Sequence, residues 1–507
     1  MEHFLSLIIF FPAVAGALGV FIDERSIKTY AVMMSLIEFA LSLFLLAFYE
    51  GGIAFSTSAS IISAYGISYF IGVDGISLFL VILSTLMTFL ALISLSIRER
   101  IKNLIISVLF LEMTMIGVFV ALDAILFYIF WELSLIPMLY IIGAWGSGRR
   151  IYAGVKFFIY TFFGSMFLLV GLIAMAYLYY KSTGELSFNL IAWQGLNLPI
   201  NAQNLLFLAF GIAFAIKTPM FPFHTWLPYA HGQAPTIGSV LLAAVLLKMG
   251  TYGFVRFSLP LFPDACVHFA PLMCILAVIM VIYTSFIAFA QKDIKQVVAY
   301  SSIAHMGVII LGIFSLGSEG ISGAIFLMIS HGITSGGLFM LVGFIYDRRH
   351  TKLLSEFGGL AKIMPVYAFC FGVVLFSGIG LPLTIGFVGE FLSLLGIYKI
   401  SFSYALFGGF GIVMGAIYSL NLYKKTFFGK ICVEQNKSLK DLKFSEISSI
   451  VPICVLCIFL GVAPNFMLSR ISPSVSENIA LMAHNAQNLA TKNYIEKANF
   501  KAVINAK

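Results

Sequence analysis

The stretch LLFLAFGIAFAIKTPMFPFHTWLP, residues 205–228, decides the fold of this chain. It opens with an apolar run that makes up most of a membrane-spanning helix, which needs about 20 such residues. Lys217 ends that run, and Pro219, Pro222 and Pro228 follow it. Because proline lacks a backbone donor and clashes with the preceding turn, the helix should open just after Lys217. The stretch therefore predicts a broken transmembrane helix that carries a buried amine at its break.

A second stretch, SGIGLPLTIGFVGEF at residues 377–391, has the same plan. Pro382 and the glycines around it should interrupt a helix just before Glu390. Interrupted helices at corresponding places in two halves of a chain indicate inverted repeats and an ion site at mid-membrane. The backbone groups freed there need water or ionisable side chains, since lipid offers no partner.

The composition of the whole chain excludes a soluble globular domain. Of its 507 residues, 61% are hydrophobic and 10% are charged, and the mean hydropathy is +1.02. The net charge of +8 would suggest nucleic acid in a soluble protein, but most Lys and Arg lie in short connections between apolar runs and so set topology. We predict an all-α polytopic membrane protein with about 14 transmembrane helices. Its surroundings are the lipid bilayer, and it binds no nucleic acid.

The apolar runs predict the positions of these helices. They are expected near residues 4–21, 29–49, 75–97, 104–121, 123–145, 154–180, 204–229, 235–258, 267–290, 294–316, 320–345, 364–396, 402–425 and 446–467.

The distribution of basic residues predicts the orientation. Alternate connections carry 19 Lys and Arg on one side of the membrane and two on the other, so the first side is cytoplasmic. Both termini are then extracytoplasmic. The segment Met1–Phe21 lacks a basic n-region and a small-residue cleavage site, and we interpret it as a retained helix.

Ionisable residues interrupt several apolar runs. Lys248 follows IGSVLLAAVLL, and Glu132 lies within FYIFWELSLIPM. Together with Lys217 and Glu390 they place a charge on each of four helices. A charge in lipid costs several kcal/mol, and such residues commonly serve transport. Because packing alone does not account for four such charges, we predict that these residues transfer protons.

Other ionisable residues leave both interpretations open. His305 or His331 alone fits a hydrogen bond between packed helices as well as a proton relay. Glu112 is ambiguous because it could lie close to an interface. Arg256 lies near a helix end, where its side chain can reach the headgroups.

Cysteine usage indicates neither a redox nor a metal site. Cys454 and Cys457 form a C-x-x-C inside the apolar run VPICVLCIFLGV, without a second pair of thiols. No Gly-rich nucleotide site is apparent. We predict no cofactor in this chain.

Several motifs resemble a known family. They are GVDGISL (72–78), LFYIFWELSLIPM (126–138), the block from Lys217 to Phe257, QVVAYSSIAHMG (296–307), MISHGITSGGLFMLVG (328–343) and GFVGEF (386–391). Together they resemble the antiporter-like membrane subunits of proton-pumping NADH:quinone oxidoreductase, respiratory complex I. Glu390 favours the chain M type, because the sibling subunits are expected to carry Lys there. Two alternatives stay open: a subunit of a multisubunit cation/proton antiporter, and a structural membrane scaffold.

The resemblance implies a domain plan. N-terminal helices occupy 1–103, two inverted five-helix half-channels occupy 104–258 and 267–425, a C-terminal helix occupies 446–467, and an extracytoplasmic tail occupies 468–507.

The resemblance also implies a proton path. Glu132 and Lys217 would form a switchable ion pair, and parting them would release a proton to Lys248. His305, His331 and water would relay it to Glu390.

The partners implied by the resemblance are the other membrane-arm subunits of complex I, in a bacterial inner membrane. NAD(H) or another donor, FMN, iron–sulfur clusters and quinone would all be bound by partner subunits. The chain would be part of an enzyme, a translocase, without a redox active site of its own.

Overall fold

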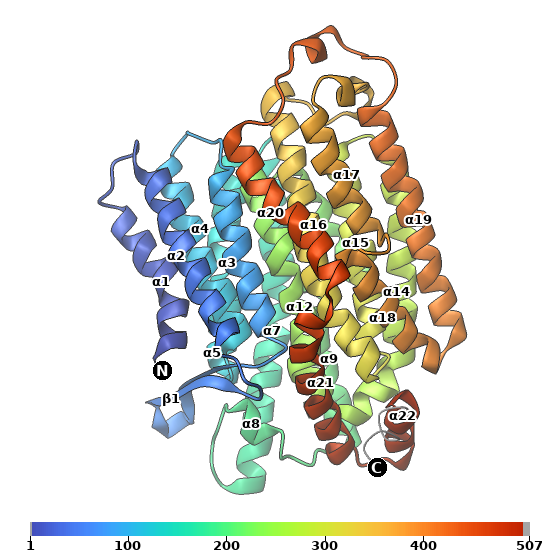
Figure 1. Cartoon of the computed structure of the whole chain (residues 1–507). Coiled ribbons are helices and arrows are strands. Elements are labelled where there is room, and N and C mark those ends of the chain that lie inside the picture. Colours follow the sequence, from blue (N-terminus) through green and yellow to red (C-terminus); the bar gives the residue numbers. More distant parts are fainter. Residues whose placement is uncertain (1–2, 500–507) are drawn as a thin grey trace.

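The computed structural model describes residues 3–499 as a bundle of long helices (Figure 1). Its α-helices and strands are α1 (Phe4–Gly19), α2 (Ile27–Ala47), β1 (Ala54–Ile62), β2 (Ile67–Val73), α3 (Leu78–Ile93), α4 (Ile101–Val120), α5 (Ala124–Leu133), α6 (Leu135–Trp145), α7 (Arg150–Thr183), α8 (Leu190–Trp193), α9 (Ile200–Lys217), α10 (Trp226–Gln233), α11 (Thr236–Leu241), α12 (Leu247–Gly253), α13 (Leu259–Leu261), α14 (Pro263–Ala290), α15 (Ile294–Ile313), α16 (Ser318–Arg349), α17 (Pro365–Ile379), α18 (Ile385–Ile400), α19 (Phe402–Phe427), α20 (Phe444–Val462), α21 (Asn465–Asn485) and α22 (Leu489–Asn499). Short 3₁₀ segments are η1 (Ser63–Tyr65), η2 (Phe223–Thr225), η5 (Leu354–Glu356), η6 (Leu360–Lys362) and η7 (Glu434–Ser438), and π-helical segments are η3 (Leu242–Leu246) and η4 (Phe254–Ser258).

The helices confirm the predicted class. Within residues 3–499, eleven of them are long and apolar enough to cross a membrane, counting α5 with α6 and α11 to α13 as single spans. The helices α1, α3 and α17 are shorter and also apolar. The chain is therefore a multi-pass membrane protein, while the number of about 14 spans stays a prediction.

Both helix breaks lie where the sequence predicted them. The helix α9 ends at Lys217, and the chain turns before it continues in η2 and α10. The helix α17 ends at Ile379, and α18 begins at Ile385, five residues before Glu390. In each break a non-glycine residue has a positive φ, 28° at Pro219 and 69° at Leu383. The backbone at these points cannot continue as a helix.

Two further irregularities lie beside predicted site residues. The helix predicted over 123–145 is interrupted at Ser134, whose hydroxyl donates a 2.7 Å hydrogen bond to the carbonyl of Trp131. Such a bond from Ser to the preceding turn bends helices. The helix predicted over 235–258 contains η3 and η4, so the α-helical turns that carry Lys248 lie between two π-helical segments.

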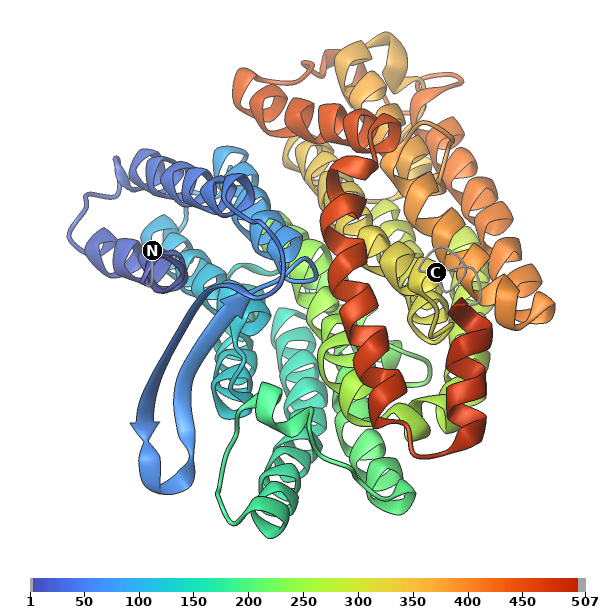
Figure 2. The same cartoon turned by 60° about the horizontal axis from the view of Figure 1, so that its bottom comes forward.

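A β-hairpin and a pair of helices, both at one end of the bundle, were not predicted from the sequence (Figure 2). The strands β1 and β2 pair antiparallel in a hairpin that extends from the helices. The helices α21 and α22 lie at the same end, and we call it the hairpin end (Figures 1 and 2). The predicted tail from residue 468 therefore contains most of α21 and all of α22, joined by the connection 486–488, and its last part, 500–507, lies outside the described residues.

The centre of the bundle consists of α16 and of the continuous stretch Thr236–Leu261. The most apolar 18-residue window of each is 100% buried inside the protein, compared with 28% for the peripheral α2. Side chains on these two central elements are shielded from lipid by the surrounding helices. They are the places where an ionisable group can lie at mid-membrane without lipid contact.

Candidate functional site

Lys248 lies at the centre of the site. Its side chain is fully buried, and its Nζ donates hydrogen bonds to the carbonyl of Ala243 in η3 and to Nδ1 of His331 on α16. The distance from Nζ to Nδ1 is 2.8 Å. When Lys248 is an ammonium group it can only donate, so Nδ1 of a neutral His331 then accepts and the ring carries its proton on Nε2. The amine and the imidazole are therefore in direct contact.

The contacts continue from His331 toward Glu390. The ring centroids of His331 and His305 are 5.6 Å apart, and Nδ1 of His305 lies 3.0 Å from Oε1 of Glu390. Glu390 is 3% exposed, and its second oxygen has no hydrogen-bond partner among the described residues. Lys248, His331, His305 and Glu390 thus form one row across α12, α16, α15 and α18. We call these four residues the central row.

A small cavity lies at the Glu390 end of the central row. Its volume is about 10 Å³, and it is lined by His305, Glu390, Tyr418 and Ser419 together with apolar residues of α14, α15, α17 and α19. A cavity of roughly 10–15 Å³ holds one water molecule. The cavity therefore has the size and the polar groups for a single water beside the carboxylate.

Lys217 and Glu132 lie apart from the central row and have mainly neutral partners. Nζ of Lys217 is 3.3 Å from the hydroxyl of Ser134 and 5.1 Å from the centroid of the Trp131 ring. The polar neighbours of the Glu132 carboxyl group are Ser165 and Tyr128, and one of its oxygens has no hydrogen-bond partner among the described residues. The two charges act on each other, but among the described residues no ion pair joins them. The structure therefore shows these two residues as neighbours that are not in contact.

The helices that carry the two lysines pack closely. A Cβ added at Gly250 would lie 2.2 Å from Oγ1 of Thr218 and 2.6 Å from the carbonyl oxygen of Phe214. Only glycine fits this crossing, because any side chain would push α12 away from the broken end of α9. The hydroxyl of Thr218 is buried and has no hydrogen-bond partner among the described residues. A polar group thus lies between Lys217 and the turn after Lys248.

His231 is a further buried histidine, outside the residues predicted to form the site. This residue is fully buried on α10 and stacks on Phe339, with ring centroids 4.4 Å apart and an interplanar angle of 13°. Neither ring nitrogen has a hydrogen-bond partner among the described residues, and the charges of Lys295 and Lys248 act on the ring. Its place in the HTWLPYAH segment could have indicated a site residue, but residue 231 falls in the connection between the predicted helices 204–229 and 235–258.

A larger cavity opens at the end of the bundle opposite the hairpin end. Its volume is about 280 Å³, and Lys295, Asp347 and Lys352 are among its lining residues. Lys295 donates to the carbonyl of Ala234, and Lys352 donates to the carbonyl of Gly232, at 2.6 and 3.0 Å. Both carbonyls follow His231 closely in the chain. The cavity therefore reaches the neighbourhood of His231 from that end.

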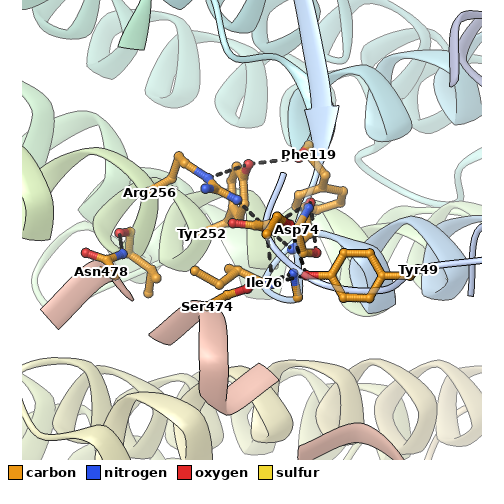
Figure 3. A network of polar contacts seen from close by, with 12 residues as sticks. Tyr49, Asp74, Ile76, Phe119, Tyr252, Arg256, Ser474 and Asn478 are labelled. Atoms are coloured by element: carbon orange, nitrogen blue, oxygen red, sulfur yellow. Dashed lines mark hydrogen bonds and ion pairs between the residues drawn. The ribbon is translucent and has the colours of Figure 1, made fainter. Parts of the chain in front are cut away.

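Arg256 corrects the expectation that its side chain reaches the headgroups. Its guanidinium forms a buried ion pair with Asp74, with 2.6 Å between the nitrogen and the oxygen (Figure 3). It also donates to the hydroxyl of Tyr252, which in turn donates to the carbonyl of Phe119 on α4. Ser474 of α21 accepts from the backbone N–H of Gly75, next to Asp74. This network ties the hairpin end of the Lys248 helix to α4 and α21.

The cysteine and histidine positions suggest no metal centre. Within residues 3–499, no group of three or more His, Cys, Asp or Glu side chains is arranged to hold a metal ion. Cys454, Cys457 and Cys370 are buried and free, where α17 and α20 pack against each other.

A family model described as NADH:quinone oxidoreductase/Mrp antiporter, TM, matches residues 121–415. The matched range contains Glu132, Lys217 and the whole central row.

The chain is also similar to individual proteins. It is 50% identical over 418 residues to NADH-quinone oxidoreductase subunit M of Rickettsia prowazekii (strain Madrid E), which covers 82% of this chain and 84% of that protein. It is 44% identical to subunit M of Rhodobacter capsulatus, covering 94% and 96% of the two chains. Among solved structures, a chain of respiratory complex I from Thermus thermophilus with bound NADH has a TM-score of 0.87 at 31% identity, covering 94% and 99%.

Proposed function

Because the chain belongs to the NADH:quinone oxidoreductase/Mrp antiporter family, in the subunit M branch, we propose that its buried row of ionisable residues carries protons for a quinone-reducing complex. The protein is a proton-translocating membrane subunit of that complex. Its partners are the other membrane-arm subunits, including sibling antiporter-like chains. Electron transfer takes place in other subunits of the complex, which bind NAD(H) or another donor, FMN, iron–sulfur clusters and quinone.

One observation supports this function above the others: Lys248, His331, His305 and Glu390 follow one another as neighbours, joined by a 2.8 Å contact, a ring-centroid distance of 5.6 Å and a 3.0 Å contact. Each member accepts or donates a proton through nitrogen or oxygen. Imidazole suits the middle positions because its unperturbed pKa lies near neutrality. Four helices contribute one residue each, so the row depends on tertiary packing and not on one amphipathic face.

Proton transfer along the row follows from these contacts. Lys248 gives a proton from Nζ to Nδ1 of His331, which leaves a neutral amine and an imidazolium. The second ring nitrogen of His331 then releases its own proton toward His305. His305 passes a proton from Nδ1 to Oε1 of Glu390, which lies at a cavity with room for one water molecule as the next acceptor. Each step moves one proton and leaves the donor ready to be protonated again.

Lys217 and Glu132 supply the switch that precedes Lys248. With Glu132 in contact, the carboxylate favours the ammonium form of Lys217, and desolvation favours the neutral amine when they part. In the structure Lys217 contacts two neutral side chains, Ser134 and Trp131, as expected when it is separated from Glu132. The interruption of the helix at Ser134 supplies a bend at which Glu132 moves relative to Lys217.

The domain plan extends this proposal. The two broken helices, α9 with α10 and α17 with α18, belong to two inverted five-helix half-channels in 104–258 and 267–425. Helices in 1–103 and the helix predicted at 446–467 flank them. The protein lies in the bacterial inner membrane with the hairpin end, both termini and the tail from residue 468 on the extracytoplasmic side. The cavity beside Lys295 then faces the cytoplasm.

The test compares variants of the assembled complex in inverted membrane vesicles. Lys248→Ala and Glu390→Gln should abolish or strongly lower NADH-driven proton translocation, because each removes one link. Lys399→Ala is the matched control, since Lys399 lies on the same helix as Glu390 and pairs with Glu319 outside the row. Normal assembly with unchanged translocation in both row variants would instead support a structural scaffold. Cation-dependent translocation without NADH would support a cation/proton antiporter.

A further inference from the structure

Two buried carboxylates lie outside the residues used so far. Glu38 on α2 and Glu112 on α4 are both 0% exposed. None of their four carboxylate oxygens has a hydrogen-bond partner among the described residues. Carboxylates that are buried in a membrane protein are costly and rare, and they mark functional positions by default.

The two residues lie at the same depth on neighbouring helices. The helices α2 and α4 pack against each other, and each glutamate follows the first residue of its helix by 11 residues. At 1.5 Å per residue this is about 16 Å along each helix, roughly half of a 30 Å hydrocarbon core. The charge of Glu38 acts directly on Glu112. The ambiguous Glu112 is therefore deep in the bundle, at the same level as Glu38 on the helix that packs beside it.

The surrounding side chains offer these carboxyl groups neither a countercharge nor a donor. Glu38 belongs to the only buried face of α2, together with Ser35 and Ser42. The Ser35 hydroxyl donates a hydrogen bond to the carbonyl of Val32, and the Ser42 hydroxyl shares a hydrogen bond with the hydroxyl of Thr85. The Thr114 hydroxyl, on α4, is bonded to the carbonyl of Leu111. No ion pair among the described residues includes Glu38 or Glu112.

Two like charges in such a place would repel each other without compensation. Desolvation alone costs several kcal/mol for each ion, and a neighbouring carboxylate adds to that cost. A bound proton removes the charge without needing a protein partner. We propose that Glu38 and Glu112 form a second proton-binding site, a carboxyl pair that holds at least one proton at neutral pH and exchanges it during turnover.

The exchange rests on the proposed function, whereas the binding of the proton does not. The helix α4 packs against α5, which carries Glu132, and a Cβ at Gly117 would lie 2.4 Å from the ring of Phe130. Any movement of α5 that parts Glu132 from Lys217 therefore presses on α4. This contact gives the carboxyl pair a physical route by which turnover changes its surroundings.

Infrared difference spectroscopy of the assembled complex tests the proposal. The C=O band of protonated carboxyl groups, identified by its shift in D₂O, is recorded at neutral pH for the wild type and for E38Q, E112Q and the double variant. Glutamine has the shape of a protonated glutamate and carries no charge, so these variants should assemble. E185Q is the control, because Glu185 is an exposed glutamate that lies outside the bundle core and outside the carboxyl pair.

The double variant should lose a band component that the control keeps, and each single variant should shift that component because the remaining carboxyl loses its partner. Adding NADH should change the component in the wild type. If the double variant does not assemble, the single variants carry the test.

An unchanged band in the variants would overturn the proton-binding site. A component that is present but insensitive to NADH would overturn the exchange and leave a structural pair. A component that disappears when Na⁺ is added would show a sodium site instead. If Lys248→Ala abolishes translocation while the carboxyl component is absent, the proposed function holds and this inference fails.

Discussion

The Asp74–Arg256 ion pair allows a prediction with a calculable size. Its nitrogen and oxygen are 2.6 Å apart, and its side chains are only 9% and 8% exposed. Removing one partner leaves a buried charge without compensation, which costs about 3–5 kcal/mol. Asp74→Ala should therefore destabilise the fold by that amount, roughly a 10²- to 10⁴-fold change in the folded-to-unfolded ratio. Arg256→Met should have a smaller effect, because the carboxylate left behind keeps its bonds to the backbone N–H groups of Ile76 and Ser77.

The assay is resistance of the assembled complex to a denaturing detergent, titrated for each variant. The informative comparison is the double variant D74L/R256M, which replaces the whole pair by apolar side chains of similar size. Such replacements are often neutral or stabilising, so the double variant should recover most of the stability lost in D74A. If the double variant is as unstable as the sum of the single variants, the pair does not act as a compensated charge and the reasoning is wrong.

Three further predictions concern the site. Lys217→Arg should lose NADH-driven translocation although it keeps the positive charge, because a guanidinium does not release its proton; retained translocation in vesicles would contradict the switch. His331→Leu should stop translocation in the same vesicle assay while Lys248 stays in place, since it removes the acceptor at 2.8 Å. His331→Gln, which keeps a polar side chain but has no imidazole to relay a proton, should assemble and also fail to translocate; translocation by either assembled variant would contradict the relay. Gly250→Ala should destabilise the complex by about 1–3 kcal/mol, because the added methyl group overpacks against Thr218 and Phe214. Gly143→Ala is the control and should not destabilise it, because a Cβ there meets only Ile151, at 3.9 Å. Equal detergent resistance of the two variants would contradict the close crossing.

The sequence predicted the features that have local causes. The breaks after Lys217 and before Glu390 follow from proline, which acts through its own ring and missing donor. The interruption at Ser134 also has local causes that the sequence analysis did not use: the hydroxyl of Ser134 bonds back to the Trp131 carbonyl, and Pro137 lacks a backbone donor and clashes with the preceding turn. The π-helical segments on either side of Lys248 contain no proline. The sequence therefore predicted a helix at these places and missed its irregularity.

Contacts between distant residues were beyond sequence reasoning. Asp74 and Arg256 are 182 positions apart, and nothing in either segment indicates the other. Because such partners are not visible in the sequence, Arg256 was expected to reach the headgroups from its helix end, and His231 was assigned to a connection between two helices. Buried charge was visible in the sequence, but the order Lys248, His331, His305, Glu390 depends on which helices are neighbours.

Lys248 and Arg256 lie eight residues apart in the same helical stretch. Arg256 has an oppositely charged partner, whereas Lys248 has only neutral ones. Arg256 has a carboxylate at 2.6 Å, which stabilises its charge permanently and fixes the helix. Lys248 is equally buried, yet its partners are a carbonyl and an imidazole, which hold the ammonium by hydrogen bonds without an opposite charge. An amine in such a place gives up its proton more readily than one in an ion pair, and the base that receives the proton is already in contact. The ion pair at one end of the stretch keeps the helix in place, and the neutral partners of Lys248 leave its proton free to move.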